Sequence, residues 1–106
     1  MADGIALEEI KKIAQKYAET LKHDLKISGV YLFGSSINGN FTQDSDIDVA
    51  VVSEDFTGDI IDDTFKLMKI RRKIDNRIEP HPVLLKDFNE GNPLVKELLN
   101  NNIKVA

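Results

Sequence analysis

The stretch 32-LFGSSINGNFTQDSDIDVAVV-52 decides how this chain folds and what chemistry it can carry. It joins two short apolar runs, Val30–Phe33 and Ile47–Val52, which we expect to form buried β-strands. Gly34-Ser35 ends the first run, and Asp46 and Asp48 stand at the mouth of the second. Carboxylates at the margin of a core are costly unless something pairs with them. The function therefore depends on what pairs with these two.

Asp46 and Asp48 are two residues apart, so in a strand they point to the same face with Cα atoms roughly 6.5 Å apart. Two such carboxylates repel each other, and a hard cation such as Mg²⁺ relieves that repulsion. Gly34-Ser35 offers the complement, because a glycine turn that enters a helix aims free N–H groups at an anion. The stretch therefore predicts a site for a nucleoside triphosphate together with its metal ions.

Gly34-Ser35, ten further residues and Asp46-Ile47-Asp48 match the pattern G-S-x(10)-D-x-D. With this motif the chain resembles the DNA polymerase β-like nucleotidyltransferase superfamily. Because the chain is short, it is most similar to the minimal nucleotidyltransferase (MNT) group, of the MntA-like antitoxin type. The resemblance implies that Gly34 and Ser35 hold the triphosphate and that Asp46 and Asp48 bind two Mg²⁺ ions. It also implies a third acid on a following strand. Glu79, in Ile78-Glu79-Pro80, is the matching candidate for third metal ligand or general base.

The activity that this resemblance implies is Mg²⁺-dependent transfer of a nucleotide, AMP from ATP, to an acceptor hydroxyl, with Asp46, Asp48 and Glu79 as catalytic residues. It further implies a separate partner, a small helical HEPN-type protein of a toxin–antitoxin pair. Two alternatives stay open: a non-catalytic antitoxin that acts by complex formation, and transfer to a small molecule. Many relatives carry basic residues after Gly-Ser, whereas Ser36–Asn40 has none. Triphosphate affinity must then rest on N–H groups, on metal, or on cations elsewhere such as Lys69 or Arg72.

The rest of the chain alternates helical and extended patterns, which predicts an α/β (α+β) fold: a small mixed β-sheet with helices packed against it, of the polymerase β palm-like nucleotidyltransferase type. Leu7, Ile10, Ala14, Tyr17 and Leu21 form one apolar face of a helix from Ile5 to about Leu25. Ser28-Gly29 is expected to break the chain before the first strand. Further segments are a helical turn within 35–39, a helix over 59–75, a strand over 77–85, a helix over 93–99 and an edge strand over 103–105.

Three local expectations concern the second half. The 59–75 helix should carry Ile60, Ile61, Phe65 and Met68 on one side. Pro80 and Pro82 each lack a backbone donor, so pairing beyond Glu79 in a central position is not expected. Asn100–Asn102 should supply a left-handed helix stop. His81 is expected to have a surface or packing role, with a place beside the site as the alternative.

The composition limits the class of protein to which this chain can belong. The 106 residues, 42% hydrophobic and 30% charged, predict one globular domain over residues 1–106. No apolar run approaches the ~20 residues of a membrane span, and the absence of cysteine excludes disulfides and thiol chemistry. We expect a cytoplasmic protein that forms a homo- or hetero-oligomer. Residues 27–65 carry eight acids and no Lys or Arg, a field that disfavours direct nucleic-acid binding.

Overall fold

The computed structural model describes residues 7–37, 45–89 and 91–106 and shows three α-helices and four β-strands. The helices are α1 (Leu7–Leu21), α2 (Ile60–Arg71) and α3 (Pro93–Asn100). The strands are β1 (Ile27–Phe33), β2 (Ile47–Ser53), β3 (Ile78–Leu84) and β4 (Asn102–Lys104). Two short 3-10 helices, η1 (Gly34–Ile37) and η2 (Leu85–Asp87), follow β1 and β3. The predicted α/β class is confirmed.

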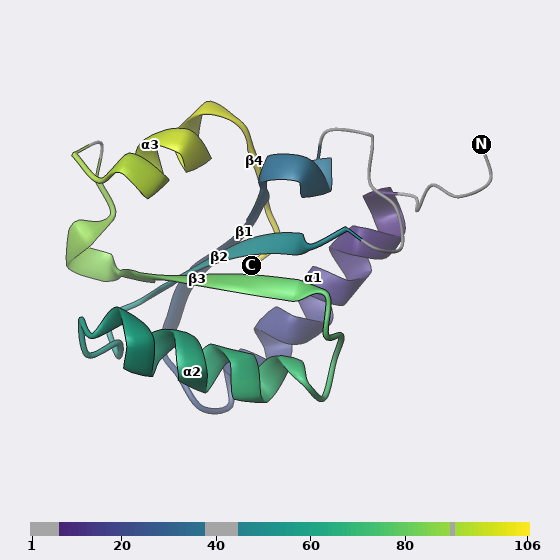
Figure 1. Ribbon diagram of the computed structural model, residues 1–106, viewed down its shortest axis with the longest axis horizontal. Helices are drawn as coiled ribbons and strands as arrows, with labels where there is room; N and C mark the ends of the chain where they lie inside the picture. Colours follow the sequence, from purple (N-terminus) through teal and green to yellow (C-terminus); the bar gives the residue numbers. More distant parts are fainter. Residues whose placement is uncertain (1–6, 38–44, 90) are drawn as a thin grey trace.

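The four strands form one mixed sheet in the order β3-β2-β1-β4 (Figure 1). β1 runs antiparallel to both β2 and β4, whereas β2 and β3 run parallel. β1 begins at Ile27, so the predicted break at Ser28-Gly29 is wrong. The strand absorbs these residues through a shift of register against β2 between Ile27 and Gly29.

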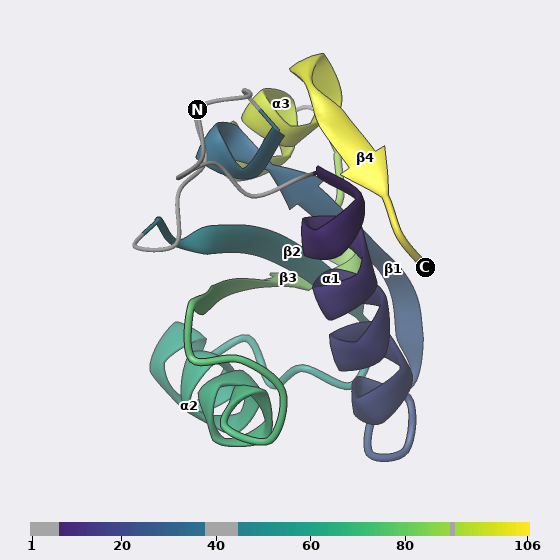
Figure 2. The same cartoon turned by 90° about the vertical axis from the view of Figure 1, so that its right-hand side faces the viewer.

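Helices lie on both faces of the sheet. Figure 2 shows α1 and α2 on one side and α3 on the other. Successive side chains of β2 point to opposite faces of the sheet, which explains this arrangement. Ile47, Val49 and Val51 belong to the larger core with α1 and α2, whereas Ala50 and Val52 pack with apolar residues of α3. β2 is therefore buried on both faces, as its apolar run predicts.

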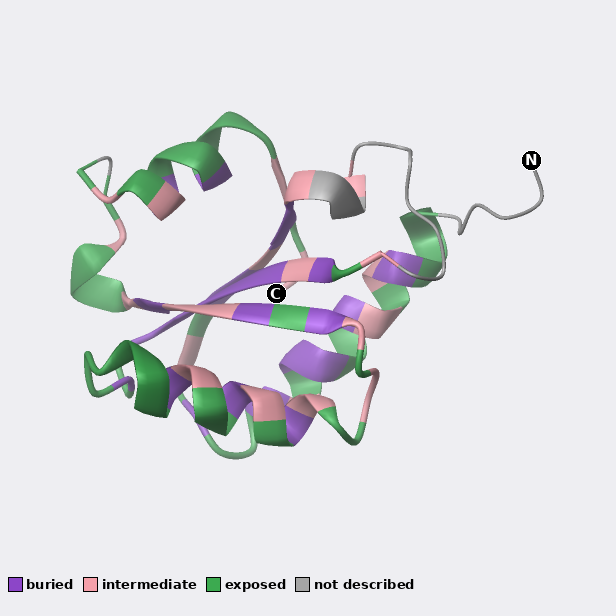
Figure 3. Ribbon diagram, in the orientation of Figure 1, coloured by how far each residue is buried: buried purple, intermediate pink, exposed green. Residues whose placement is uncertain are grey.

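The apolar side of α2 predicted from the sequence faces away from the core (Figure 3). Ile60, Ile61 and Phe65 are 66%, 76% and 60% exposed, whereas Leu67 and the acidic Asp63 are buried. Hydrogen bonds fix this rotation, because the Asp63 carboxylate accepts from the backbone N–H and hydroxyl of Thr57 and from the N–H of Gly58. The helix also ends at Arg71 rather than near residue 75.

β3 is an edge strand, so the prediction that its prolines exclude a central position is confirmed. Its pairing with β2 nevertheless continues past Glu79 to Leu84. Pro80 and Pro82 are two residues apart, so both missing donors fall on the same side of the strand, and an edge strand tolerates them on its open side. After α3, Asn101 has a φ of −160°, which corrects the predicted left-handed stop. None of the described helices is long and apolar enough to cross a bilayer.

Candidate active site

The acidic residues singled out in the sequence meet Gly34 at one end of the sheet. β1 ends where the antiparallel β2 begins, and β3 begins beside the start of β2 because those two strands are parallel. In this register Asp48 and Glu79 are direct neighbours across the two strands. Asp46 immediately precedes β2 and is exposed. Strand order therefore places Gly34, the two aspartates and Glu79 in one row across the sheet.

Gly34 is fitted closely to Asp48. Its φ is +65°, a left-handed conformation that side chains disfavour, and a Cβ atom there would lie 2.8 Å from Oδ2 of Asp48. The glycine therefore lets the first turn of η1 approach the carboxylate. Ser35 is the second residue of η1; its side chain lies outside the described part of the structure.

Glu79 lies in an acidic environment that raises its pKa above the ordinary value. Partial burial is the largest cause, followed by a hydrogen bond with the side chain of Asp46 and by the negative charges of Asp46 and Asp48. The nearby His81 acts in the opposite direction. This arrangement favours a proton on Glu79 as long as no cation balances the carboxylates.

His81 also belongs to this cluster. Its Nε2 lies 3.4 Å from Oδ1 of Asp48, and its ring stands edge-on to the ring of Phe33 with centroids 5.1 Å apart. The predicted surface or packing role therefore describes the contact of His81 with Phe33 but not its contact with Asp48. His81 is two residues after Glu79, a spacing that places both on the same face of β3.

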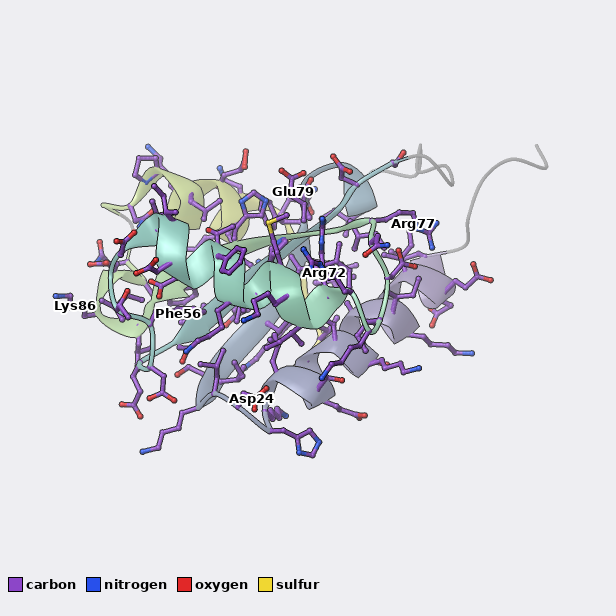
Figure 4. The ribbon with its side chains drawn as sticks, turned by 60° about the horizontal axis from the view of Figure 1, so that its bottom comes forward. Asp24, Phe56, Arg72, Arg77, Glu79 and Lys86 are labelled. Atoms are coloured by element: carbon purple, nitrogen blue, oxygen red, sulfur yellow. The ribbon has the colours of Figure 1, made fainter. Side chains whose placement is uncertain are left out.

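A pocket of about 480 Å³ opens beside the carboxylates at the β3 edge. Its lining combines the polar cluster with apolar side chains from α2, β3 and α3: Asp46, Glu79, His81, Ile60, Thr64, Met68, Arg71, Pro80, Pro82 and Leu94. Figure 4 shows Glu79 on β3 beside α2. The pocket is large enough for part of a small ligand or for a side chain of a larger one.

Arg71 is the cation that lines this pocket, and sequence reasoning missed it. Its Nη1 donates a 2.7 Å hydrogen bond to the carbonyl of Ile78, and its buried Nε has no partner within the described residues. Lys69 instead lies over the ring of Phe65, 5.5 Å from its centroid. Neither Lys69 nor Arg72 is among the described residues that line the pocket.

The oxygen ligands in this cluster are of the type that Mg²⁺ prefers. The negative charges of Asp46 and Asp48 contribute to the raised pKa of Glu79, and a bound cation would offset this repulsion. In their present positions, however, no three acidic or histidine side chains of the described residues converge on one metal position. The donor chemistry fits Mg²⁺, and the roles of Asp46, Asp48 and Glu79 as metal ligands stay predictions.

Sequence comparisons give a consistent family. The model "Polymerase beta, Nucleotidyltransferase" matches residues 8–106. Three proteins of Methanocaldococcus jannaschii, each named "Putative protein adenylyltransferase", are also similar. One is 28% identical over 97 residues, which cover 92% of this chain and 94% of that protein. The other two are 44% and 40% identical over 45 residues, and these matches span 45% and 52% of their lengths.

Two solved structures share the fold. A "putative nucleotidyltransferase" from Sulfolobus solfataricus superposes with a TM-score of 0.63 and 21% identity, covering 98% of this chain and 89% of that chain. A chain from the Shewanella oneidensis complex of tri-AMPylated HEPN toxin with MNT antitoxin superposes with a TM-score of 0.58, also at 21% identity, covering 95% of this chain and 72% of that chain. The predicted nucleotidyltransferase fold is therefore confirmed.

Proposed function

The chain belongs to the polymerase beta nucleotidyltransferase family, and from that premise we propose that it transfers AMP from ATP to a hydroxyl group of an acceptor protein. The observation that carries the proposal is the row of Gly34, Asp46, Asp48 and Glu79 at one end of the sheet. The names of the M. jannaschii relatives support a protein as the acceptor. The complex of tri-AMPylated HEPN toxin with MNT antitoxin supports a HEPN-type partner.

In the proposed reaction the acceptor oxygen bonds to the α-phosphorus of ATP, and the bond from that phosphorus to the β-phosphate oxygen breaks. Pyrophosphate leaves, and the acceptor proton passes to the Glu79 carboxylate. A base must lie within hydrogen-bond reach of the hydroxyl, and Glu79 on the edge strand lines the pocket from which an acceptor can approach.

The remaining residues position the nucleotide. Backbone N–H groups at the start of η1 (Gly34–Ile37), next to Gly34, would bind the triphosphate. Asp46, Asp48 and Glu79 would hold two Mg²⁺ ions, which when bound neutralise the triphosphate charge and stabilise the leaving pyrophosphate. Catalysis in such a site is mostly positioning and charge balance.

Label transfer from [α-³²P]ATP tests this function. The protein is incubated with Mg²⁺, labelled ATP and a lysate of its source organism, and proteins are separated by gel electrophoresis. We expect label on a discrete protein band with the wild type and a loss of at least a hundredfold with Asp46→Asn/Asp48→Asn. The matched control, Glu8→Gln/Glu19→Gln, removes two exposed charges on α1 and should leave transfer unchanged.

Two results contradict the proposal. Transfer that persists in the Asp46→Asn/Asp48→Asn variant removes the catalytic assignment. Label that appears only in the small-molecule fraction, with no labelled protein, removes the protein acceptor.

A further inference from the structure

The side of α2 that faces away from the core carries an unusual group of exposed apolar residues. Ile60, Ile61 and Phe65 are each more than half exposed, and with Thr64 and Met68 they line an apolar hollow of about 370 Å³. The other exposed large apolar residues among those described, Leu7, Leu85 and Leu99, lie singly on separate elements. Scattered apolar residues are ordinary on a protein surface, whereas a contiguous patch indicates an interaction site.

The fold itself does not require this patch. The opposite side of α2 already provides the core contacts through Leu67 and Ile70, and the hydrogen bonds of Asp63 fix the rotation of the helix. Exposure of large apolar side chains forgoes the free energy that their burial would contribute. Such a face on a helix becomes favourable once another molecule covers it.

The patch is continuous with the candidate active site. Ile60, Thr64 and Met68 line both the apolar hollow and the pocket that contains Asp46 and Glu79. Gly34 and η1, where the nucleotide phosphates are expected, follow β1, while this patch lies beside the edge strand β3. A molecule seated on α2 therefore approaches Glu79 from the side left free for the acceptor. In Figure 4 α2 faces the viewer beside Glu79.

The charges around the patch indicate the chemistry of its partner. Lys66 and Lys69 are exposed on α2, with Arg72 and Lys73 just beyond its end, and none of these four has an ion pair with a described residue. Lys69 lies directly over Phe65 at the patch. The single exposed acid within α2 at this side is Asp62, near its start. An apolar surface flanked by acidic side chains complements this arrangement.

A partner polypeptide cannot readily dock at this edge of the sheet by adding a strand to β3. β3 carries Pro80 and Pro82, which lack the N–H donors that an added strand needs. A partner at this edge must therefore bind through side-chain packing on α2 rather than by extending the sheet.

We propose that the exposed face of α2, made of Ile60, Ile61, Phe65 and Met68, is the docking surface for the acceptor protein. The acceptor covers it with apolar side chains flanked by acidic residues and presents its hydroxyl to Glu79 through the adjoining pocket. This inference rests on the proposed AMP transfer and adds the surface that selects the acceptor.

The test uses Ile61→Asp/Phe65→Asp, because these two residues lie on the patch and do not line the pocket. Label transfer from [α-³²P]ATP to protein in the source-organism lysate should fall at least tenfold. Affinity for a fluorescent ATP analogue in Mg²⁺ should stay unchanged, as should the circular dichroism spectrum. Leu99→Asp is the matched control, since Leu99 is 50% exposed on α3 away from the patch, and it should transfer label like the wild type.

A second pair of variants tests the charges. Lys66→Glu/Lys69→Glu should reduce protein labelling several-fold and weaken its dependence on salt, whereas Lys12→Glu/Lys16→Glu on α1 should leave both unchanged. A photoreactive benzoylphenylalanine at position 65 should crosslink to the same protein that receives the label. A crosslink to a second copy of this chain, or to an unlabelled protein, overturns the proposal.

The two proposals fail differently. Equal labelling by the wild type and Ile61→Asp/Phe65→Asp removes the docking surface and leaves the transfer reaction standing. Absence of any Mg²⁺-dependent protein labelling by the wild type removes the transfer reaction, and with it the presentation of an acceptor by α2.

Discussion

Gly34 and Asp48 are packed so closely that no side chain fits between them: a Cβ atom on Gly34 would lie 2.8 Å from Oδ2 of Asp48. The contact joins the residue that follows β1 to the second residue of β2. It places the start of η1 directly beside a candidate metal ligand. Gly34 of the Gly-Ser element and Asp48 of the Asp-x-Asp element are thus in contact in the folded chain.

Gly34→Ala should therefore damage the site more than the fold. The positive φ alone costs an alanine about 1–2 kcal/mol, and the added methyl group must also displace the Asp48 carboxylate. We expect label transfer to fall at least tenfold. Gly58→Ala is the matched control, because Gly58 also has a positive φ, of 94°, but open space around its Cβ position. Thermal denaturation should show similar losses of stability for both, and equal transfer activities would contradict the interpretation.

His81→Ala should reduce the activity without unfolding the protein. The imidazole contacts Asp48 at 3.4 Å and can orient that carboxylate. Loss of a group that orients a metal ligand typically costs about 10–100-fold in metal affinity or activity, so the Mg²⁺ concentration for half-maximal transfer should rise. His23→Ala, which changes an exposed histidine after α1, should have no effect. An unchanged Mg²⁺ dependence in His81→Ala would show that the contact only packs the ring against Phe33.

Glu79→Gln should make the metal-free protein more stable while it abolishes transfer. Burial and the neighbouring Asp46 and Asp48 carboxylates raise the pKa of Glu79, which means that its charged form is disfavoured in the folded state. A neutral amide removes that repulsion and can still hydrogen-bond to Asp46. Because Glu79 is exposed, solvent screening limits the gain to roughly 0.5 kcal/mol.

Urea denaturation at pH 7 in EDTA and in Mg²⁺ measures this effect. Mg²⁺ should stabilise the wild type more than Glu79→Gln, since ligands that bind the folded state stabilise it. A Glu79→Gln variant that is less stable than the wild type in EDTA, or equally stabilised by Mg²⁺, would contradict the assignment.

The central strands and α1 are predicted well from the sequence because each of their hydrophobic patterns fits only one type of structure. A run such as Ile47–Val52 must be buried on both faces, and the α1 stripe has a single apolar side. The motif likewise predicts which carboxylates meet Gly34, since strand direction brings them to the same end of the sheet.

For α2 the hydrophobic pattern predicts which apolar residues share a side, but hydrophobicity does not decide which side of the helix faces the core. Three hydrogen bonds to Asp63 hold an acid inward, and the apolar Ile61 and Phe65 remain outside. Arg71 was not assigned to the site, and His81 only as an alternative, for a related reason. Their places depend on how α2 packs beside β3 and on the parallel register of β2 and β3, which a single sequence does not display.

The turn before β3, which positions Glu79, leads to a prediction about how stability depends on pH. Side-chain hydrogen bonds from Arg77 hold the pKa of Asp75 below its ordinary value, and the Arg77 backbone N–H and positive charge act in the same direction. These hydrogen bonds measure 3.0 Å from Nε, 2.8 Å from Nη2 and 2.8 Å from the backbone N–H. The carbonyl of Arg77 in turn accepts a 2.7 Å hydrogen bond from the N–H of Ile47. The turn therefore fixes the start of β3 against β2.

Asp75→Asn should lower the free energy of unfolding at pH 7 by about 1.5–3 kcal/mol, the usual scale for hydrogen bonds to a charged group. A carboxylate whose pKa is lower in the folded than in the unfolded state contributes stability above the unfolded value, near 3.8, and loses it as the pH falls through the folded value. The difference between wild type and variant in urea denaturation should thus be constant from pH 7 to about pH 5 and shrink below pH 4. Asp24→Asn, an exposed acid after α1, should show no such difference. A difference that stays the same down to pH 2.5 would mean that Asp75 holds the turn by shape rather than by charge.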